Sequence, residues 1–276
     1  MMIVKLMLSV GRRMSAAAAM DVVALAVAAR SDSAAGGKAA RVTGIDFSGD
    51  CYSGEWSTYA PAIAAAKAAG LKVTLHVGEK DDEAELAAML AAGPDRIGHL
   101  VFAGAANVAR VRAAKIPLEL CITSNLLTTD WSVDSHHVRE WFAYAAPPSS
   151  SPPNGAAETA AAAPSSVLDL VPTLAHPISI NTDDRGVFDT SMTRELVLFC
   201  AAIAGPGGSS HRGSADAAGD RPVTREEAQA LVAVTRQAIR DAFVATENER
   251  HATLRALERF CAQPSVAPLL QAAKEE

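Results

Sequence analysis

Residues 71–79 read LKVTLHVGE, and this stretch has the alternation of side chains that is typical of a β-strand. Lys72, Thr74 and His76 share one parity, whereas two valines and a leucine occupy the positions between and after them. Because successive side chains of a strand point to opposite faces, one face is apolar and the other is polar. The inside of a barrel, with a site at the carboxyl ends of its strands, is a place where such a polar face is useful.

Six apolar, strand-like runs recur along the chain. They cover residues 3–10, 41–49, 71–79, 95–102, 116–124 and 176–184. Alanine-rich helix candidates stand between several of them, and two of these end at Gly70 and Gly93, where a glycine follows the last turn. Regular alternation of strand and helix predicts an α/β fold, with parallel strands joined by crossover helices.

The division into two faces returns in other runs. In the last one, Ser179, Asn181 and Asp183 share one face, while Ile178 and Ile180 share the other. The runs that contain GIDFS and LELCITS divide in the same way. Polar groups from several buried strands must converge, so we expect them to meet in the interior of a barrel.

Composition excludes several classes of protein. The chain has 276 residues, of which 49% are hydrophobic, enough for a sizeable core in a single domain covering 1–276. Its net charge of −6 leaves no basic stripe, so we expect no contact with nucleic acid. Four widely spaced cysteines without a C-x-x-C pair favour reduced thiols, and we predict a cytoplasmic protein.

The first twenty residues, MMIVKLMLSVGRRMSAAAAM, permit two interpretations. An apolar run followed by Arg12, Arg13 and alanines is compatible with a targeting peptide. A secretory signal carries its positive charge before the apolar run, however, so a strand followed by a helix is the favoured interpretation. No stretch approaches the roughly 20 uncharged apolar residues of a membrane helix, and we expect no membrane association.

Two segments interrupt the alternation. Residues 145–166 and 204–222 are rich in proline, serine, glycine and alanine, and we predict that both are flexible insertions. The pattern resumes after each of them, so neither predicts a domain boundary. The last part of the chain predicts a pair of amphipathic helices, the first of which begins after Thr224.

Titratable residues gather at the expected carboxyl ends of the strands. They are His76, Glu79, His99, Asp183 and Asp184. Each alone has an ordinary explanation, such as a structural histidine, a solvated loop or a capped turn. Five of them at strand ends favour a shared site, and the adjacent aspartates suggest a cation that neutralises one carboxylate.

Five motifs, namely GIDFSGD, HVGE, DRIGHL, LELCITSN and SINTDDRGVFDTSMTREL, occur in this order. Together they resemble the adenosine deaminase-like family of zinc-dependent aminohydrolases, which fold as (β/α)8 barrels. The T-D-D-x-G-V-F form is more similar to the branch that acts on N6-methyl-AMP than to the branch that acts on free adenosine. The resemblance implies a small purine nucleoside or nucleotide as partner, with N6-methyl-AMP converted to IMP or adenosine to inosine.

The resemblance also implies a role for each residue. His76 and Asp183 are expected to ligate one Zn²⁺ per chain. Glu79 is expected to give a proton to ring N1, and His99 to hold and polarise the attacking water. Asp184 is expected to contact that water and the N7 edge of the purine. The backbone of Gly49 is expected to approach the ring closely.

The chain departs from the family pattern at its beginning. The family opens with a strand carrying H-x-H, which supplies two more zinc ligands, but none of the seven histidines forms H-x-H or precedes His76. The six strands correspond to the third to the eighth of the family barrel, so we predict an incomplete, N-terminally truncated barrel. His136 and His137 could replace the missing ligands only if their segment folded inward. Leu100 stands where the family usually has glycine.

Three interpretations therefore stay open. The first is a zinc-dependent deaminase, and the second is a catalytically inactive remnant that still binds a purine. The third is a fragment, such as the product of an incomplete gene model or a splice variant, that has no stable fold of its own.

Overall fold

A computed structural model describes residues 4–35, 41–145, 166, 168, 171–204, 223–243 and 246–271. The insertions predicted at 145–166 and 204–222 lie almost entirely outside these residues, so their flexibility stays a prediction. The single domain predicted over residues 1–276 also stays a prediction.

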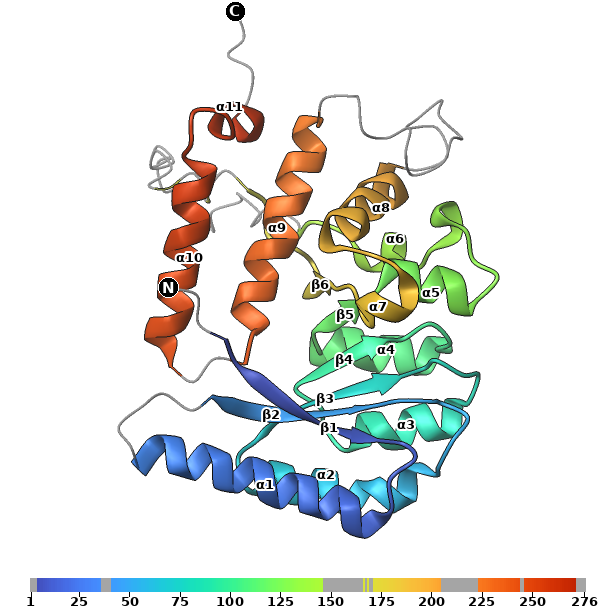
Figure 1. Cartoon of the computed structure of the whole chain (residues 1–276). Coiled ribbons are helices and arrows are strands. Elements are labelled where there is room, and N and C mark those ends of the chain that lie inside the picture. Colours follow the sequence, from blue (N-terminus) through green and yellow to red (C-terminus); the bar gives the residue numbers. More distant parts are fainter. Residues whose placement is uncertain are drawn as a thin grey trace, which may run out of the picture.

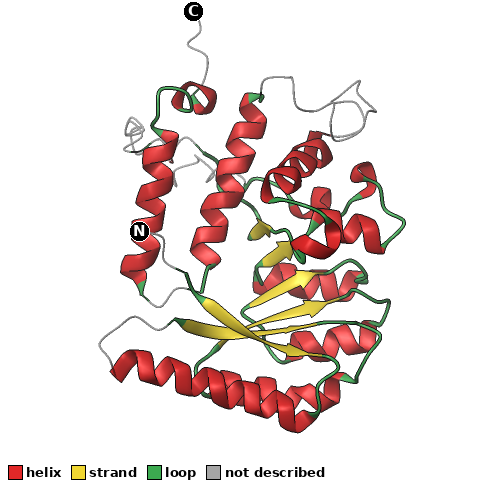
Figure 2. Cartoon of the chain, in the orientation of Figure 1, coloured by secondary structure: helices red, strands yellow, loops and turns green. Residues whose placement is uncertain are grey.

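The architecture is a parallel sheet flanked by helices (Figures 1 and 2). Its strands are β1 (Leu6–Gly11), β2 (Val42–Ser48), β3 (Lys72–Val77), β4 (Arg96–His99), β5 (Leu118–Leu120) and β6 (Ile178–Ile180). They lie in chain order, and each pairs with the next in parallel. The expected α/β class and all six expected strands are confirmed, although β5 and β6 are shorter than the apolar runs that predicted them. Within the described residues, β1 and β6 each pair on one side only, so the sheet is open.

Helices follow most of the strands. The first four are α1 (Ala16–Ala35), α2 (Trp56–Ala68), α3 (Glu83–Ala91) and α4 (Ala105–Ala114). The short elements α5 (Ile122–Thr128), η1 (Val133–Ser135) and α6 (Val138–Trp141) come after β5, and α7 (Arg185–Phe188) and α8 (Met192–Ala204) after β6. The chain continues with α9 (Arg225–Asp241), α10 (Glu247–Cys261) and α11 (Ala267–Leu270). None of the described helices has the length and apolarity that crossing a membrane requires.

Local capping explains where several helices begin. The side chain of Asp82 accepts a hydrogen bond from the backbone N–H of Glu85 at the start of α3. Thr224 and Glu227 form a capping box at the start of α9, which confirms the helix predicted after Thr224. Thr246 and Glu249 form a second capping box at the start of α10. The expected pair of C-terminal helices is therefore present.

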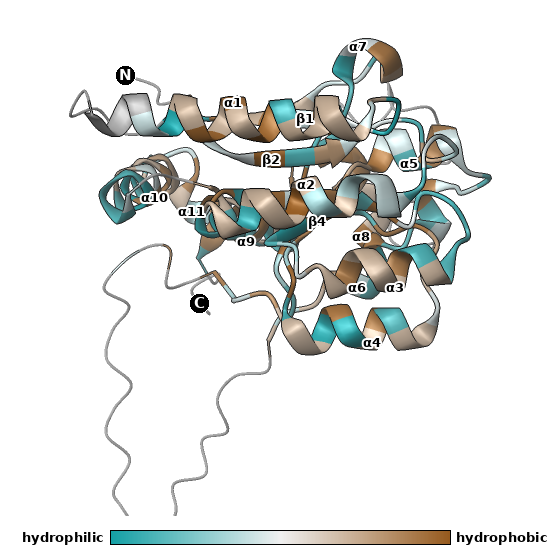
Figure 3. Cartoon of the chain, turned by 90° about the horizontal axis from the view of Figure 1, so that it is seen from below, coloured by the Kyte–Doolittle hydropathy of each residue, from teal (hydrophilic) through white to brown (hydrophobic). Residues whose placement is uncertain are grey.

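The core lies between the apolar face of the sheet and the helices. Val73, Leu75 and Val77 of β3 are almost completely buried, as the alternation in this stretch predicted. Phe47 of β2 packs edge-on against Trp56, and its ring centroid lies 5.1 Å from that of Tyr59 on α2. Hydrophobic and hydrophilic residues mix along the outer helix α4 (Figure 3), where Val111 is buried and its neighbours are exposed. The polar face of the sheet is thereby left free to form a site.

Candidate active site

The polar faces of the strands line a cavity of about 310 Å³. Its lining residues are Met7, Asp46, Thr74, His76, Arg96, Gly98, His99, Glu119, Cys121, Asn181 and Asp183. His76, Glu119, Asn181 and Asp183 all belong to the faces that the sequence marked as polar. The alternation therefore identified which side of the sheet carries the cavity.

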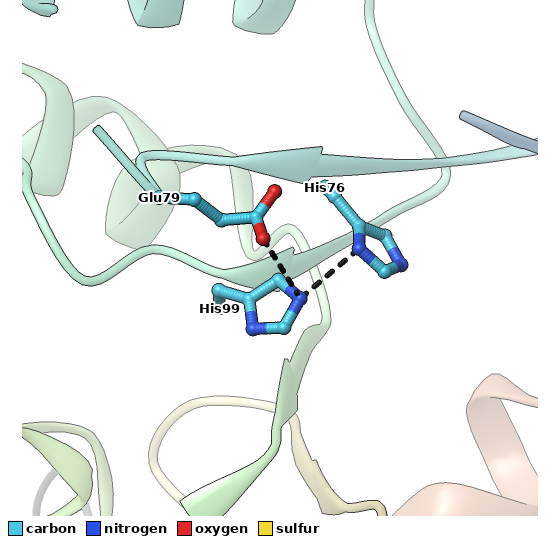
Figure 4. A group of neighbouring side chains, drawn as sticks. All are labelled: His76, Glu79 and His99. Atoms are coloured by element: carbon cyan, nitrogen blue, oxygen red, sulfur yellow. Dashed lines mark hydrogen bonds and ion pairs between the residues drawn. The ribbon is translucent and has the colours of Figure 1, made fainter. Parts of the chain in front are cut away.

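His99 stands at the centre of the site. Its Nε2 lies 3.0 Å from Nδ1 of His76 and 3.7 Å from Oε1 of Glu79. Figure 4 shows the three side chains converging, with His76 at the end of β3, Glu79 just beyond it and His99 at the end of β4. These residues come together because parallel strands present their carboxyl ends at the same edge of a sheet.

Asp183 approaches the same atom from beyond β6, and its Oδ2 lies 3.8 Å from Nε2 of His99. Possible metal-ligating atoms within 4.8 Å of one another form two groups among the described residues. One group is His76, Glu79 and His99, and the other is His99, Cys121 and Asp183. The groups share His99, and neither holds both His76 and Asp183. The assignment of these two residues as metal ligands therefore stays a prediction.

The backbone is strained at this edge of the sheet. His99, Leu100 and Asp183 have φ values of 62°, 51° and 54°, a region that favours glycine. Leu100, which stands where the family usually has glycine, thus adopts a conformation that glycine accepts at little cost. Backbone strain of this kind is often found at active sites.

The cavity is electrostatically suited to a cation. Burial, followed by the neighbouring His99, lowers the pKa of His76. Burial raises the pKa of Asp46, and it raises the pKa of the Cys121 thiol well above its usual value with further help from nearby carboxylates. In addition, Oε2 of Glu79 is buried without a hydrogen-bond partner in the described part of the chain. Imidazoles and carboxylates gathered in this way are ligands that Zn²⁺ accepts, so the residues present fit the expected metal.

The remaining predicted residues lie at the margin. Gly49 follows β2 directly with a φ of 103°, and Asp184 precedes α7. Both are exposed, and neither lines the cavity. Their expected contacts with a purine remain predictions.

Three residues behind His99 were not recognised from the sequence as part of the site. Nδ1 of His99 lies 3.1 Å from Oδ1 of Asn125, and Nδ2 of Asn125 lies 3.2 Å from Nε2 of His136. Nε2 of His137 donates a hydrogen bond of 2.8 Å to the backbone carbonyl of His99. The histidine segment thus folds inward, yet it reaches His99 through Asn125 and through the backbone carbonyl, and neither of its histidines belongs to the two groups of possible ligands. The adjacent histidines were visible in the sequence, but nothing there pointed to His99 as their partner.

Asp46 was also missed. Its Oδ1 lies 3.4 Å from Nε2 of His76, so the His76 ring has a polar neighbour at each nitrogen. The sequence placed Asp46 on a polar face and gave no reason to pair it with this histidine.

A parallel sheet with flanking helices and a histidine–carboxylate site at its carboxyl edge is the arrangement of an α/β enzyme of the (β/α)-barrel type, although the six described strands do not close into a barrel. The adenosine deaminase family model matches residues 2–150, more than half of the chain, and the chain belongs to this family. The resemblance drawn from the motifs is therefore confirmed.

Individual relatives agree with this assignment. The N6-mAMP deaminase of Arabidopsis thaliana is 33% identical over 201 residues, which are 72% of this chain and 46% of that protein. The N6-methyl-AMP deaminase of Mus musculus is 34% identical over 165 residues, which are 57% of this chain and 38% of that protein. The crystal structure of arabidopsis ADAL complexed with IMP is 29% identical, with a TM-score of 0.67 over 95% of this chain and 59% of that one. The chain thus spans about half the length of the curated relatives it matches.

Proposed function

We propose that this chain acts as a zinc-dependent hydrolytic deaminase that converts N6-methyl-AMP to IMP and methylamine. The observation that carries the proposal is the convergence of His76, Glu79 and Asp183 around Nε2 of His99 at the carboxyl edge of the sheet. The named activity of the relatives supports the purine substrate.

His76 and Asp183 are the proposed ligands of one Zn²⁺. When bound, Zn²⁺ lowers the pKa of a water molecule toward about 7, which makes a nucleophile available at neutral pH. Catalytic zinc sites usually have three protein ligands and one open position. Glu79, His99 and Cys121 are the other possible donors near His76 and Asp183 in the described part of the chain.

Glu79 is the proposed proton donor. As the oxygen of water bonds to C6, the ring nitrogen N1 gains electron density and takes the proton from Glu79. The C6–N6 bond then breaks and the product keeps the C6 carbonyl and the N1 proton. Of the two protons of the water, one leaves with methylamine and the other returns to Glu79. The unpaired, buried Oε2 of Glu79 suits this role, because it is available to a ligand in the cavity.

His99 is proposed to hold the attacking water through Nε2, which faces the cavity. Asp184 and the backbone of Gly49 are proposed to contact the N7 edge and the face of the purine. A nucleotide is the preferred substrate, because structures of similar proteins are complexed with IMP and GMP. Adenosine is the alternative substrate.

One observation favours a second function. His76 and Asp183 fall in separate groups of possible ligands within the described residues, as expected of a chain that binds purines without turning them over.

One experiment separates the two functions. Purified full-length chain, supplied with Zn²⁺, is incubated with N6-methyl-AMP, AMP and adenosine, and the products are followed by chromatography while bound zinc is measured by mass spectrometry. Formation of IMP and methylamine with stoichiometric zinc supports the deaminase. Binding of IMP in calorimetry without any turnover supports the second function instead.

A further inference from the structure

The chemistry available to His99 depends on which of its two ring nitrogens carries the proton. Nε2 faces His76, Glu79 and Asp183, whereas Nδ1 faces the buried side chain of Asn125. In a neutral imidazole, one nitrogen donates a hydrogen bond and the other accepts one or ligates a cation. The group that contacts Nδ1 therefore decides whether Nε2 presents a proton or a lone pair to the cavity.

His136 begins a chain of contacts that settles this choice. The backbone N–H of Val138 donates a hydrogen bond of 3.0 Å to Nδ1 of His136. A backbone N–H is always a donor, so this nitrogen carries no proton. His136 is only 1% exposed, and burial, followed by the neighbouring His137, lowers its pKa to about 3. The ring is neutral at pH 7, and its one proton sits on Nε2.

Nε2–H of His136 points at the amide of Asn125, whose nearest atom is Nδ2 at 3.2 Å. In that orientation two N–H groups face each other in a buried contact, which leaves both donors unsatisfied. A turn of the amide by 180° exchanges its oxygen and nitrogen without a change of shape. After the turn, Oδ1 of Asn125 accepts from His136, and the amide N–H donates to Nδ1 of His99.

We propose that Asn125 and His136 are positioning residues that hold His99 in the tautomer with its proton on Nε2. Each contact in the chain then joins one donor to one acceptor. In the chain without metal, Nε2–H of His99 donates to Nδ1 of His76 at 3.0 Å, and Nε2 of His76 faces Oδ1 of Asp46 at 3.4 Å.

The tautomer has a direct consequence for the site. A protonated Nε2 has no lone pair, so His99 presents a hydrogen-bond donor to the cavity and does not ligate a cation, although its position suits a ligand. If the proposed deaminase function holds, binding of Zn²⁺ to His76 would release the N–H of His99 from its bond to that residue, and this donor would then hold the attacking water. The assignment of the tautomer does not itself depend on turnover.

The neighbouring His137 fixes the backbone of the same residue. Its Nε2 donates to the carbonyl oxygen of His99, where φ is 62°. The Trp131 ring packs against both histidines, edge-on to His136 and tilted to His137, with ring centroids 5.6 Å and 4.9 Å away. The pair therefore holds the side chain of His99 through Asn125 and its main chain directly.

Histidine tautomers are distinguished by long-range ¹H–¹⁵N correlation spectra of full-length chain labelled with ¹⁵N-histidine, recorded at pH 7.5 without metal. We expect a protonated Nε2 and an unprotonated Nδ1 for His99, whose signals are assigned by their loss in the His99→Gln variant. In Asn125→Asp, a variant of the same shape, both carboxylate oxygens accept, so Nδ1 of His99 should become protonated. His176 is the internal control, because its Nε2 donates to the carbonyl of Ile116 outside this network and its signals should not change.

The wild-type spectrum alone can overturn the proposal, since a proton on Nδ1 of His99 contradicts it. An unprotonated Nδ1 in folded Asn125→Asp contradicts it as well, and circular dichroism verifies that the variant is folded. Failure of the deaminase function is a separate result. A chain that forms no IMP but shows His99 protonated on Nε2 loses the proposed reaction and keeps the positioning role of Asn125 and His136.

Discussion

The Nε2 atom of His99 lies 3.0 Å from the Nδ1 atom of His76, although the two residues are 23 positions apart. Pairing of β3 with β4 places His76 directly beside Gly98. The next residue is His99, and its positive φ turns its own side chain toward the cavity. A small residue in the strand and a strained residue at its end thus create the contact at the centre of the site.

Replacement of Glu79 by glutamine should reduce turnover of N6-methyl-AMP by about 10²–10⁴-fold, because the variant keeps the shape of the side chain and loses its acidic proton. Bound zinc should remain unchanged, and mass spectrometry of the purified variant checks this. Glu55→Gln is the matched control, since Glu55 is exposed and its side chain caps no helix. Full activity in Glu79→Gln would remove this residue as the proton donor.

Replacement of Gly98 by alanine should weaken zinc binding. A Cβ at this position would lie 3.3 Å from Cδ2 and 3.7 Å from Nε2 of His76, so the imidazole must shift. We expect a loss of affinity of about 10-fold, measured by competition with a chelator, as for disturbed neighbours of metal ligands in general. Gly11→Ala, another strand glycine, should leave the affinity unchanged, because nothing lies within 4 Å of the added atom. Equal affinities in the two variants would argue against His76 as a ligand.

Replacement of Gly44 by alanine should destabilise the sheet. The added Cβ would lie 2.4 Å from the backbone oxygen of Lys72, on the strand that pairs with β2. Because the obstacle is backbone, the strands must separate locally, and we expect a loss of about 1–3 kcal/mol in the free energy of unfolding. Urea unfolding followed by circular dichroism measures the loss, and Gly11→Ala again serves as the control. A midpoint identical to that of the wild type would contradict the β2–β3 register.

Stability should fall as the pH is lowered from about 6.5 toward 4. Burial lowers the pKa of His136 to about 3 and those of His137 and His176 to about 4. Below pH 6.5 the unfolded chain takes up protons that the folded chain refuses, so each of these histidines destabilises the fold as the pH falls. For each of these groups, the free energy of unfolding changes by up to about 1.4 kcal/mol per pH unit.

Urea unfolding at pH 7, 6 and 5 measures this slope. His176→Gln should make the free energy of unfolding less dependent on pH, by the amount that one titrating histidine contributes. Glutamine can still donate to the carbonyl of Ile116, and it does not titrate. A slope that is the same in this variant as in the wild type would show that His176 is not held neutral by the fold.

Much of the fold was readable from local patterns. The alternation in β3 depends only on neighbouring residues, so it revealed the strand and both of its faces. The lengths of β5 and β6 could not be predicted from the sequence, because an apolar run can continue beyond the last residue that pairs with the adjacent strand. Whether the segments at 145–166 and 204–222 are flexible is still a prediction.

The sequence by itself determined that His76, Glu79, His99 and Asp183 would meet, because parallel strands must share one carboxyl edge. The tertiary structure alone decided what lies behind them. Asn125 and His137 reach His99 from 26 and 38 residues away, and the left-handed backbone at His99 and Asp183 leaves no mark on residue type. The direction of a hydrogen bond depends on how two distant groups are placed, and that placement is set by packing, which no local pattern records.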